Sequence, residues 1–270
     1  MSRTGREAHS AVRPAGATWP VEVGEEAGVR TLHFGSEWVQ GAMRIARPWA
    51  LELDYTRELM AALLLRPEAE WPGWPARVLQ VGLGAASITK FLYRHRPEAR
   101  LDIMEIHPDV VAVARHAFKL PDDDKRIRIA MGDGADLVLR PGPAYDLIVV
   151  DGFDDQARAG ALDTVPFYAA CRTRLGERGL LAVNLLSRRR DYRGSVARIG
   201  EAFDGRVLAF PSCDSGNAVA FAAEGAPVVT TLAELKQSAQ ALRKATGLNL
   251  LPTLARVAAA KRWAEGRVEL

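Results

Sequence analysis

The stretch VLQVGLGAASITKFL, residues 78–92, decides the fold of this chain. Apolar or neutral residues run into Gly82 and Gly84, and a helix-like segment follows. This order is typical of a strand that opens onto a nucleotide-binding turn, where glycine lets a ligand approach the backbone and the N-terminus of the next helix. A lone G-x-G turn is weak evidence for binding, because glycine also meets purely steric needs in such turns. The rest of the chain has to decide between these two interpretations.

A regular alternation of strand-like and helix-like segments surrounds this turn. The strand-like runs, apolar on both faces, cover 77–83, 100–106, 126–132, 145–151 and 179–185. Helical patterns lie between them, at 86–95, 108–118, 134–140 and 165–175. Two later runs, 206–210 and 217–223, predict an antiparallel pair at the sheet edge. We therefore predict an α/β fold with a doubly wound, mostly parallel seven-stranded sheet that helices cover on both sides.

The segments that flank this pattern predict the domain organisation. Residues 1–19 are polar and rich in Gly, Pro and Arg, which predicts a disordered tail. Residues 20–66 predict an N-terminal β-strand region, with a hairpin turn at EEAG, followed by a helix over 50–65. Residues 67–270 then form the predicted nucleoside-binding catalytic domain, and its tail from 231 onward predicts two helices that break at GLNLLP.

Composition and charge exclude several classes of protein. The net charge of +3 argues against nucleic acid as an obligatory partner. Without an apolar N-terminal segment or a run of 18 apolar residues, we expect neither a signal peptide nor a membrane span. The two cysteines, Cys171 and Cys213, fit a reducing compartment, so a cytoplasmic location is predicted. Neither the cysteines nor the histidines show metal-ligand spacing, so we expect no metal site.

Four predicted strands end in residues that could bind a nucleoside. After the Gly82–Gly84 turn comes Glu105, whose carboxylate can accept hydrogen bonds from two ribose hydroxyls. Asp133 and Gly134 follow the third strand, and Asp151 ends the fourth. Each acid could instead cap a helix or close a turn. Because the carboxyl ends of parallel strands meet at one edge, the four features together favour a nucleoside site of the S-adenosylmethionine type.

NAD is the main competing ligand for such a fold. The dinucleotide fingerprint needs a third glycine after G-x-G, whereas Gly84 is followed by Ala85, Ala86 and Ser87. A dinucleotide also has no need of Asp133, the acid in the GDG stretch at 132–134. The sequence therefore argues against NAD.

Residues 31–225 resemble the polyamine aminopropyltransferases, which include the spermidine and spermine synthases. The resemblance rests on VLQVGLG, IMEIHPDVVAVARHAF, RIRIAMGDGADLV, YDLIVVDGFDD and FYAACRTRLGERGLLAVNL, and also on FGSEWVQ, LDYTRELMAALLL and SGN. The glycine turn, the acid and GDG occur throughout class I methyltransferases as well. The D-x-x-D after the fourth strand and the upstream Gln and Tyr are more specific. The resemblance implies a Rossmann-like methyltransferase fold with a small N-terminal β-hairpin region.

On the donor side, the resemblance implies an adenosyl sulfonium co-substrate and no tightly bound cofactor. The co-substrate is either decarboxylated S-adenosylmethionine or S-adenosylmethionine. Gln40 and Glu105 are similar to the residues that hold the sugar and nearby groups, and Asp133 and Gly134 to the adenine-binding pair. The resemblance also implies a homodimer of this chain, formed through its N-terminal strands.

On the acceptor side, the resemblance implies that Asp151 is the general base, with Asp154 and Tyr55 orienting a polyamine or another small amine. Elementary chemistry agrees with this assignment. An alkylammonium has a pKa near 10, and the attacking nitrogen must be unprotonated, so a carboxylate that takes its proton is useful. Two carboxylates three residues apart suit a diamine with separated cationic nitrogens.

Four positions depart from the family pattern. The acid expected after the glycine turn is Ala85, and the His or Gln expected after the tyrosine is Thr56. Phe153 stands where the loop D-S-[ST]-D-P has a small polar residue, and the tyrosine expected before the closing strand aligns with Phe210. Three functions therefore stay open: an aminopropyltransferase, a methyltransferase that uses S-adenosylmethionine itself, and a non-catalytic nucleoside-binding relative.

Overall fold

A central sheet of parallel strands organises the computed structural model, which describes residues 19–123, 125–186, 192–210, 216–260, 263–264 and 266–270. The strand order of this sheet is β6-β5-β4-β7-β8-β10-β9, and β10 runs antiparallel to both of its neighbours. The predicted seven-stranded, mostly parallel sheet and its closing antiparallel pair are therefore confirmed. The strands are β4 (Arg77–Val81), β5 (Arg100–Glu105), β6 (Ile127–Met131), β7 (Tyr145–Val150), β8 (Leu175–Leu186), β9 (Val207–Phe210) and β10 (Asn217–Ala223).

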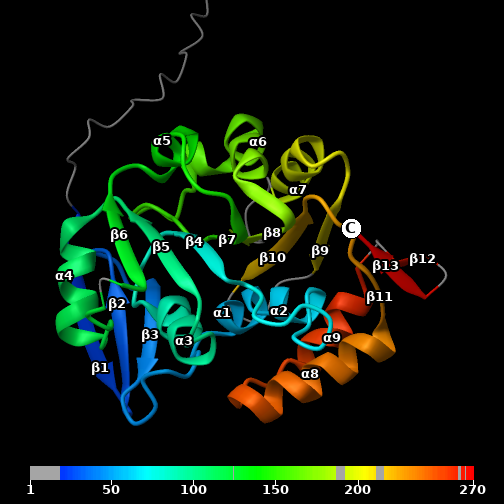
Figure 1. Ribbon diagram of the computed structural model, residues 1–270. Helices are drawn as coiled ribbons and strands as arrows, with labels where there is room; N and C mark the ends of the chain where they lie inside the picture. The colour runs from blue at the N-terminus through cyan, green and yellow to red at the C-terminus, as the bar shows by residue number, and fades with distance from the viewer. Residues whose placement is uncertain (1–18, 124, 187–191, 211–215, 261–262, 265) are drawn as a thin grey trace, which may run out of the picture.

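Helices cover both faces of this sheet (Figure 1). On each face, the apolar side chains of the helices and of the sheet pack together in one core. One face carries α1, α2, α3 and α4, and the other carries α5, α6 and α7. Sequence periodicity predicted most of these helices but not α7, whose two glycines weaken the helical signal. The bounds are α3 (Ser87–His95), α4 (Pro108–Ala117), α5 (Gly134–Leu139), α6 (Val165–Thr173) and α7 (Tyr192–Ala202), with a 3₁₀ turn at Gly160–Asp163.

The N-terminal region forms a separate antiparallel sheet beside α3. The predicted hairpin is present as β1 (Glu22–Glu26) and β2 (Val29–His33), and β3 (Val39–Arg44) extends it to three strands. The turn falls at Ala27 and Gly28, which both have positive φ, within the predicted EEAG segment. The helix predicted over 50–65 is present as two short helices, α1 (Asp54–Leu59) and α2 (Ala62–Leu65). The predicted tail at 1–19 lies, apart from Trp19, outside the described residues.

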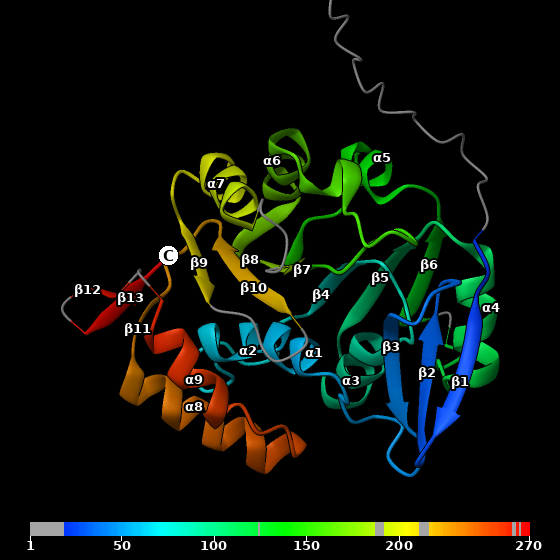
Figure 2. The same cartoon turned by 180° about the vertical axis from the view of Figure 1, so that it is seen from behind.

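The C-terminal segment packs beside α2, at the end of the molecule away from the N-terminal sheet (Figure 2). Two helices are present as predicted, α8 (Leu232–Thr246) and α9 (Leu251–Ala258), and Gly247 ends the first with φ of 80°. A small sheet, β11 (Val229–Thr231), β13 (Arg267–Glu269) and β12 (Trp263–Ala264), was not predicted. Within the described part of the chain, no helix is long and apolar enough to cross a membrane.

Candidate active site

The glycine turn lies where β4 meets α3, at the middle of the sheet. Gly82 and Gly84 have φ of 90° and 51°, values that glycine adopts without strain. A Cβ on Gly82 would stand 2.1 Å from the carbonyl oxygen of Asp151, so that position admits no side chain. The turn is therefore pressed directly against the end of β7, and the two strand ends form one continuous edge.

Glu105 ends β5, and its carboxylate accepts a hydrogen bond from the glycine turn. Its Oε2 accepts the N–H of Leu83 at 2.8 Å, and its Oε1 accepts the N–H of His107 at 2.9 Å. Only 7% of the residue is exposed, and this burial raises the pKa of the carboxyl, although bonds from His107, Leu83 and Ile106 oppose the rise. Because a carboxylate can accept about four hydrogen bonds, Glu105 keeps capacity for a ribose hydroxyl. The N-cap of α4 is His107, whose own side chain accepts the N–H of Asp109, so Glu105 is not the cap of that helix.

Asp133 and Gly134 follow β6 on the same edge. Asp133 is exposed and caps α5, since its Oδ1 accepts the N–H of Ala135 at 2.8 Å. A Cβ on Gly134 would lie 2.4 Å from Cγ1 of Val81, so this helix start is packed closely against β4. The exposed side chain of Met131, at the end of β6, adds apolar surface beside these residues.

Asp151 follows β7, and hydrogen bonds from two other elements orient its carboxylate. Asn184 on β8 donates from Nδ2 to Asp151 Oδ1 at 2.7 Å, and the Tyr55 hydroxyl on α1 donates to the same carboxylate. Asn217, the first residue of β10, in turn donates from Nδ2 to Asn184 Oδ1 at 2.8 Å. The chain of bonds thus joins four segments that are far apart in sequence.

Burial determines the protonation behaviour of Asp151. Loss of solvent around the carboxylate raises its pKa to about 6, and the bonds from Asn184 and Tyr55 oppose that rise. A carboxylate with this pKa is still ionised at neutral pH, and it is a stronger base than an ordinary aspartate. Asp151 can therefore take a proton near neutral pH.

A small cavity of about 10 Å³ brings several predicted residues together. A volume of this size has room for about one water molecule. Its wall includes four predicted site residues and two of the positions that depart from the family pattern: Gln40, Tyr55, Gly84 and Asp151, and Thr56 and Ala85. The residues expected to meet the donor tail and the base therefore face the same space.

The departing positions within this region are buried and apolar or already bonded. Ala85 is 3% exposed, and β3 passes so close to it that a Cβ on Gly41 would lie 2.6 Å from the Ala85 Cβ. Thr56 donates from Oγ1 to the carbonyl of Leu53 at 2.6 Å. Phe210 lies in β9, fully buried against Phe221, so it is a core residue. The segment 211–215, between Phe210 and the closing strand, lies outside the described residues.

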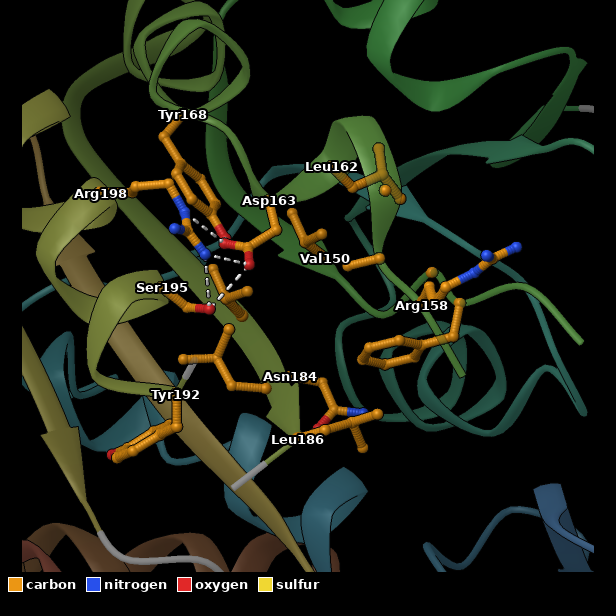
Figure 3. A pocket seen from close by; sticks show the side chains of 16 residues that line it. Val150, Arg158, Leu162, Asp163, Tyr168, Asn184, Leu186, Tyr192, Ser195 and Arg198 are labelled. Carbon is orange, nitrogen blue, oxygen red and sulfur yellow. Dashed lines mark hydrogen bonds and ion pairs between the residues drawn. The ribbon is translucent and has the colours of Figure 1, made fainter. Parts of the chain in front are cut away.

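Asp154 does not face the small cavity but forms an ion pair with Arg158 within its own loop. Arg158 and Phe153 contribute to a second, larger cavity of about 380 Å³ beyond the ends of β7 and β8. Figure 3 shows this cavity, with Arg158 on the side opposite Arg198. Asp163 accepts bonds there from the side chains of Tyr168, Ser195 and Arg198 at 2.6–2.9 Å.

Comparison with known proteins identifies the family. A polyamine aminopropyltransferase of Chromobacterium violaceum is 36% identical over 238 residues, which cover 88% of this chain and 89% of that protein. A polyamine aminopropyltransferase of Neisseria meningitidis is 33% identical over 251 residues, 93% of this chain and 94% of that protein. This chain belongs to the polyamine aminopropyltransferase family. Its resemblance to that family, predicted from the motifs, is confirmed, and the chain is an enzyme of the transferase class. No family model matches the chain.

Solved structures share the fold of this aminopropyltransferase. A probable spermidine synthase of Corynebacterium glutamicum has a TM-score of 0.68 at 18% identity, covering 85% of this chain and 91% of that one. Human methyltransferase-like protein 13, solved in complex with SAH, has a TM-score of 0.65 at 24% identity, and the match covers 72% of this chain and 93% of that one. A spermidine synthase in complex with the transition-state analogue AdoDATO has a TM-score of 0.56 at 24% identity, and the match covers 76% of this chain and 74% of that one. The predicted Rossmann-like methyltransferase fold is confirmed.

Sequence reasoning missed the polar side chains that support the site of this aminopropyltransferase. Gln80, in the middle of β4, donates from Nε2 to the carbonyl of Gly82 at 2.7 Å and accepts from the Thr89 hydroxyl at 2.8 Å. Asn184 on β8 donates to Asp151, and Asn217 on β10 donates to Asn184. The available signal was a single Gln or Asn inside an otherwise apolar strand, because a buried polar side chain needs a hydrogen-bond partner.

Proposed function

We propose that this chain moves the aminopropyl group of decarboxylated S-adenosylmethionine to a nitrogen of a polyamine, with Asp151 as the general base. The observation that carries the proposal is the hydrogen-bonded Asp151 at the end of β7, whose pKa burial raises to about 6. Family membership supports the aminopropyl group and the polyamine. The two substrates would meet between the N-terminal region, residues 20–66, and the nucleoside-binding domain, residues 67–270.

The reaction is an in-line displacement at the carbon next to the sulfonium sulfur. The amine nitrogen forms a bond to that carbon while the carbon–sulfur bond breaks, and its electron pair returns to sulfur. The leaving group is neutral 5′-methylthioadenosine. The Asp151 carboxylate removes the proton that the nitrogen carries, and general-base assistance of this kind contributes typically 10²–10⁴-fold to a rate.

The donor would bind along the ends of β4, β5 and β6. Glu105 has hydrogen-bonding capacity for a ribose hydroxyl, and Gln40 on β3 faces the same cavity as Gly84. Asp133 would accept from the adenine amino group, which its exposed position at the start of α5 supports. Gly134 would let the start of α5 pack against Val81 and so keep Asp133 at the edge where the adenine binds.

The acceptor would bind beyond β7. Tyr55 would fix the carboxylate of Asp151 and line the path of the attacking nitrogen. Asp154, three residues after the base, would attract a second ammonium of the polyamine. Exposed apolar side chains of the N-terminal region support a homodimer formed through its strands: Val23 on β1, Val39 on β3, and Trp38 just before β3.

Methyl transfer from S-adenosylmethionine is the second candidate, and Ala85 is the observation that favours it. The buried Ala85 side chain offers neither charge nor a hydrogen bond to the donor tail. A carboxylate at this position would repel the carboxylate of S-adenosylmethionine, so its absence removes one reason to reject that donor.

Product analysis tests the two candidates directly. The protein is incubated with each sulfonium donor and with a panel of polyamines, and the products are resolved by mass spectrometry. Aminopropyl transfer adds C₃H₇N to the amine, whereas methyl transfer adds CH₂. Aminopropylated amine together with 5′-methylthioadenosine is the expected result. A methylated amine together with S-adenosylhomocysteine would establish the alternative.

A further inference from the structure

The Asp154 carboxylate is fully occupied by donors from its own loop. Oδ1 accepts the backbone N–H groups of Gln156 and Arg158, both at 2.9 Å. Oδ2 accepts from Arg158 Nε at 2.9 Å and lies 2.8 Å from Nη2 of the same guanidinium. The backbone donors fix the loop, whereas Arg158 supplies the compensating charge. Since the two kinds of donor use different oxygens, the charge can be removed without removing the backbone bonds.

This ion pair lies where the acceptor amine would extend away from the base. Arg158 lines the larger cavity together with Gly152 and Asn184, and Figure 3 labels Arg158 and Asn184. Asn184 also donates to Asp151. The side chains of Asp154 and Arg158 are 25% and 46% exposed, so incoming solutes reach both. Asp154 borders this cavity only through Arg158, and Asp163, the carboxylate that lines it, is already paired with Arg198. A second ammonium that enters here therefore meets carboxylates that already carry a cation.

We propose that Arg158 is a specificity-determining residue, an internal cation that competes with the second ammonium of the acceptor for Asp154. This inference rests on the proposed function. An acceptor with a distal ammonium must displace the guanidinium, whereas a monoamine makes no such demand. Arg158 thus lowers the affinity for diamines relative to monoamines and sets the polyamine concentration at which the site fills.

The size of the effect follows from the strength of the pair. Partly exposed ion pairs favour the paired state only modestly, and an apparent affinity falls with the fraction of protein in the competent state. Together these relations give a roughly two- to sixfold weakening of diamine binding by Arg158. Arg158→Gln should remove that weakening, because glutamine keeps part of the length of the side chain and loses its charge.

Calorimetry with the full chain and saturating 5′-methylthioadenosine tests the inference without requiring turnover. The probes are 1,4-diaminobutane, spermidine and n-butylamine. Arg158→Gln should tighten binding of the first two about two- to sixfold and leave n-butylamine unchanged. Arg30→Gln, which removes a charge of the same sign from the exposed Arg30–Glu25 pair in the N-terminal sheet, is the matched control and should change none of them.

A second background separates competition from a general loss of positive charge. In Asp154→Asn protein, Arg158→Gln should give no gain in diamine affinity, because the contested carboxylate is absent. The inference would be overturned if Arg158→Gln raised diamine affinity equally in both backgrounds, raised the affinity for n-butylamine as much, or left diamine affinity unchanged. Failure of both 1,4-diaminobutane and spermidine to bind would also overturn it. Diamine binding that follows the expected pattern without aminopropyl transfer would refute the proposed function and leave the role of Arg158 intact. Thermal unfolding of each variant verifies that it is folded.

Discussion

The proposed donor and acceptor ends of the site are held by different kinds of bonds. At the donor end, Glu105 and Asp133 bond to backbone N–H groups close to them in sequence or in the neighbouring turn. At the acceptor end, Asp151 bonds to the side chains of Asn184 and Tyr55, which come from β8 and α1.

This difference determines how each end should respond to substitution. Backbone donors persist through most substitutions, so a donor end built on them needs only its glycines and its acid. A network of side chains depends on the identity of each member, and a change in one alters the others. The departures at Ala85, Thr56 and Phe153 belong to neither set of bonds: the first two line the small cavity, where the Thr56 hydroxyl bonds to the Leu53 carbonyl, and Phe153 lines the larger one.

Replacement of Asp151 should produce the largest effect and separate the two ends most clearly. Asp151→Asn keeps the shape of the side chain but cannot take the proton, so turnover should fall about 10²–10⁴-fold. Calorimetric binding of 5′-methylthioadenosine should change little, because the donor end is intact. The wild-type rate should also rise with pH through about 6, where Asp151 ionises, and further as the amine loses its proton. Near-normal turnover of Asp151→Asn would refute the mechanism.

Asp151→Asn should also stabilise the fold, because burial of the charged Asp151 carboxylate lowers the free energy of unfolding at neutral pH. The native pKa of about 6 lies above the unfolded value near 3.9, so the native state binds the proton more tightly. The free energy of unfolding therefore falls as pH rises from about 4 to about 6, by about 3 kcal/mol. Urea unfolding should show Asp151→Asn to be more stable than wild type at pH 7, with a gap that closes toward pH 4. A gap independent of pH would contradict the assignment of this pKa.

At the donor end, Glu105→Ala should weaken nucleoside binding by about 1–3 kcal/mol, the cost of losing charge-assisted hydrogen bonds. The variant also releases the N–H groups of Leu83 and His107 from the carboxylate. Calorimetry with 5′-methylthioadenosine measures the change, and Glu98→Ala, before β5, serves as a control for the loss of an acid. Undiminished binding in Glu105→Ala would remove this residue from the site.

The smallest of these effects concerns the boundary between the two ends. Ala85→Asp would place a carboxylate near the donor tail, and it should shift preference toward the decarboxylated donor by roughly two- to tenfold. Competition between the two sulfonium donors measures the shift, with unfolding midpoints to verify that the buried acid is tolerated. An unchanged preference would mean that the turn does not meet the donor tail.

The sequence predicted the fold well because its signals are local. Continuous apolar runs identified the parallel strands, and the match at 217–223 extends to the bounds of β10. The helix α7 and the sheet formed by β11, β13 and β12 were missed. The first contains Gly194 and Gly200, and the second pairs segments of two or three residues whose register depends on distant contacts.

The site was predictable only where its chemistry follows a strand end. Asp151 and Glu105 could be found from their position after apolar runs. Asn184 and Gln80 stand out as single amides in apolar strands, but their partners could not be predicted, because nothing in the sequence indicates which residue a buried amide will bond across the sheet. The ion pair of Asp154 with Arg158 likewise depends on how the loop closes.

The close approach of β3 to the glycine turn has a consequence for how this protein can evolve. A side chain at position 41 would collide with Ala85, because a Cβ there would stand 2.6 Å from the Ala85 Cβ and 2.9 Å from its backbone nitrogen. Position 41 is therefore restricted to glycine for as long as the backbone at position 85 keeps its place, and a library that varies position 41 alone will return few folded clones. A library aimed at donor selectivity should keep Gly41 and vary position 85, whose side chain lines the small cavity.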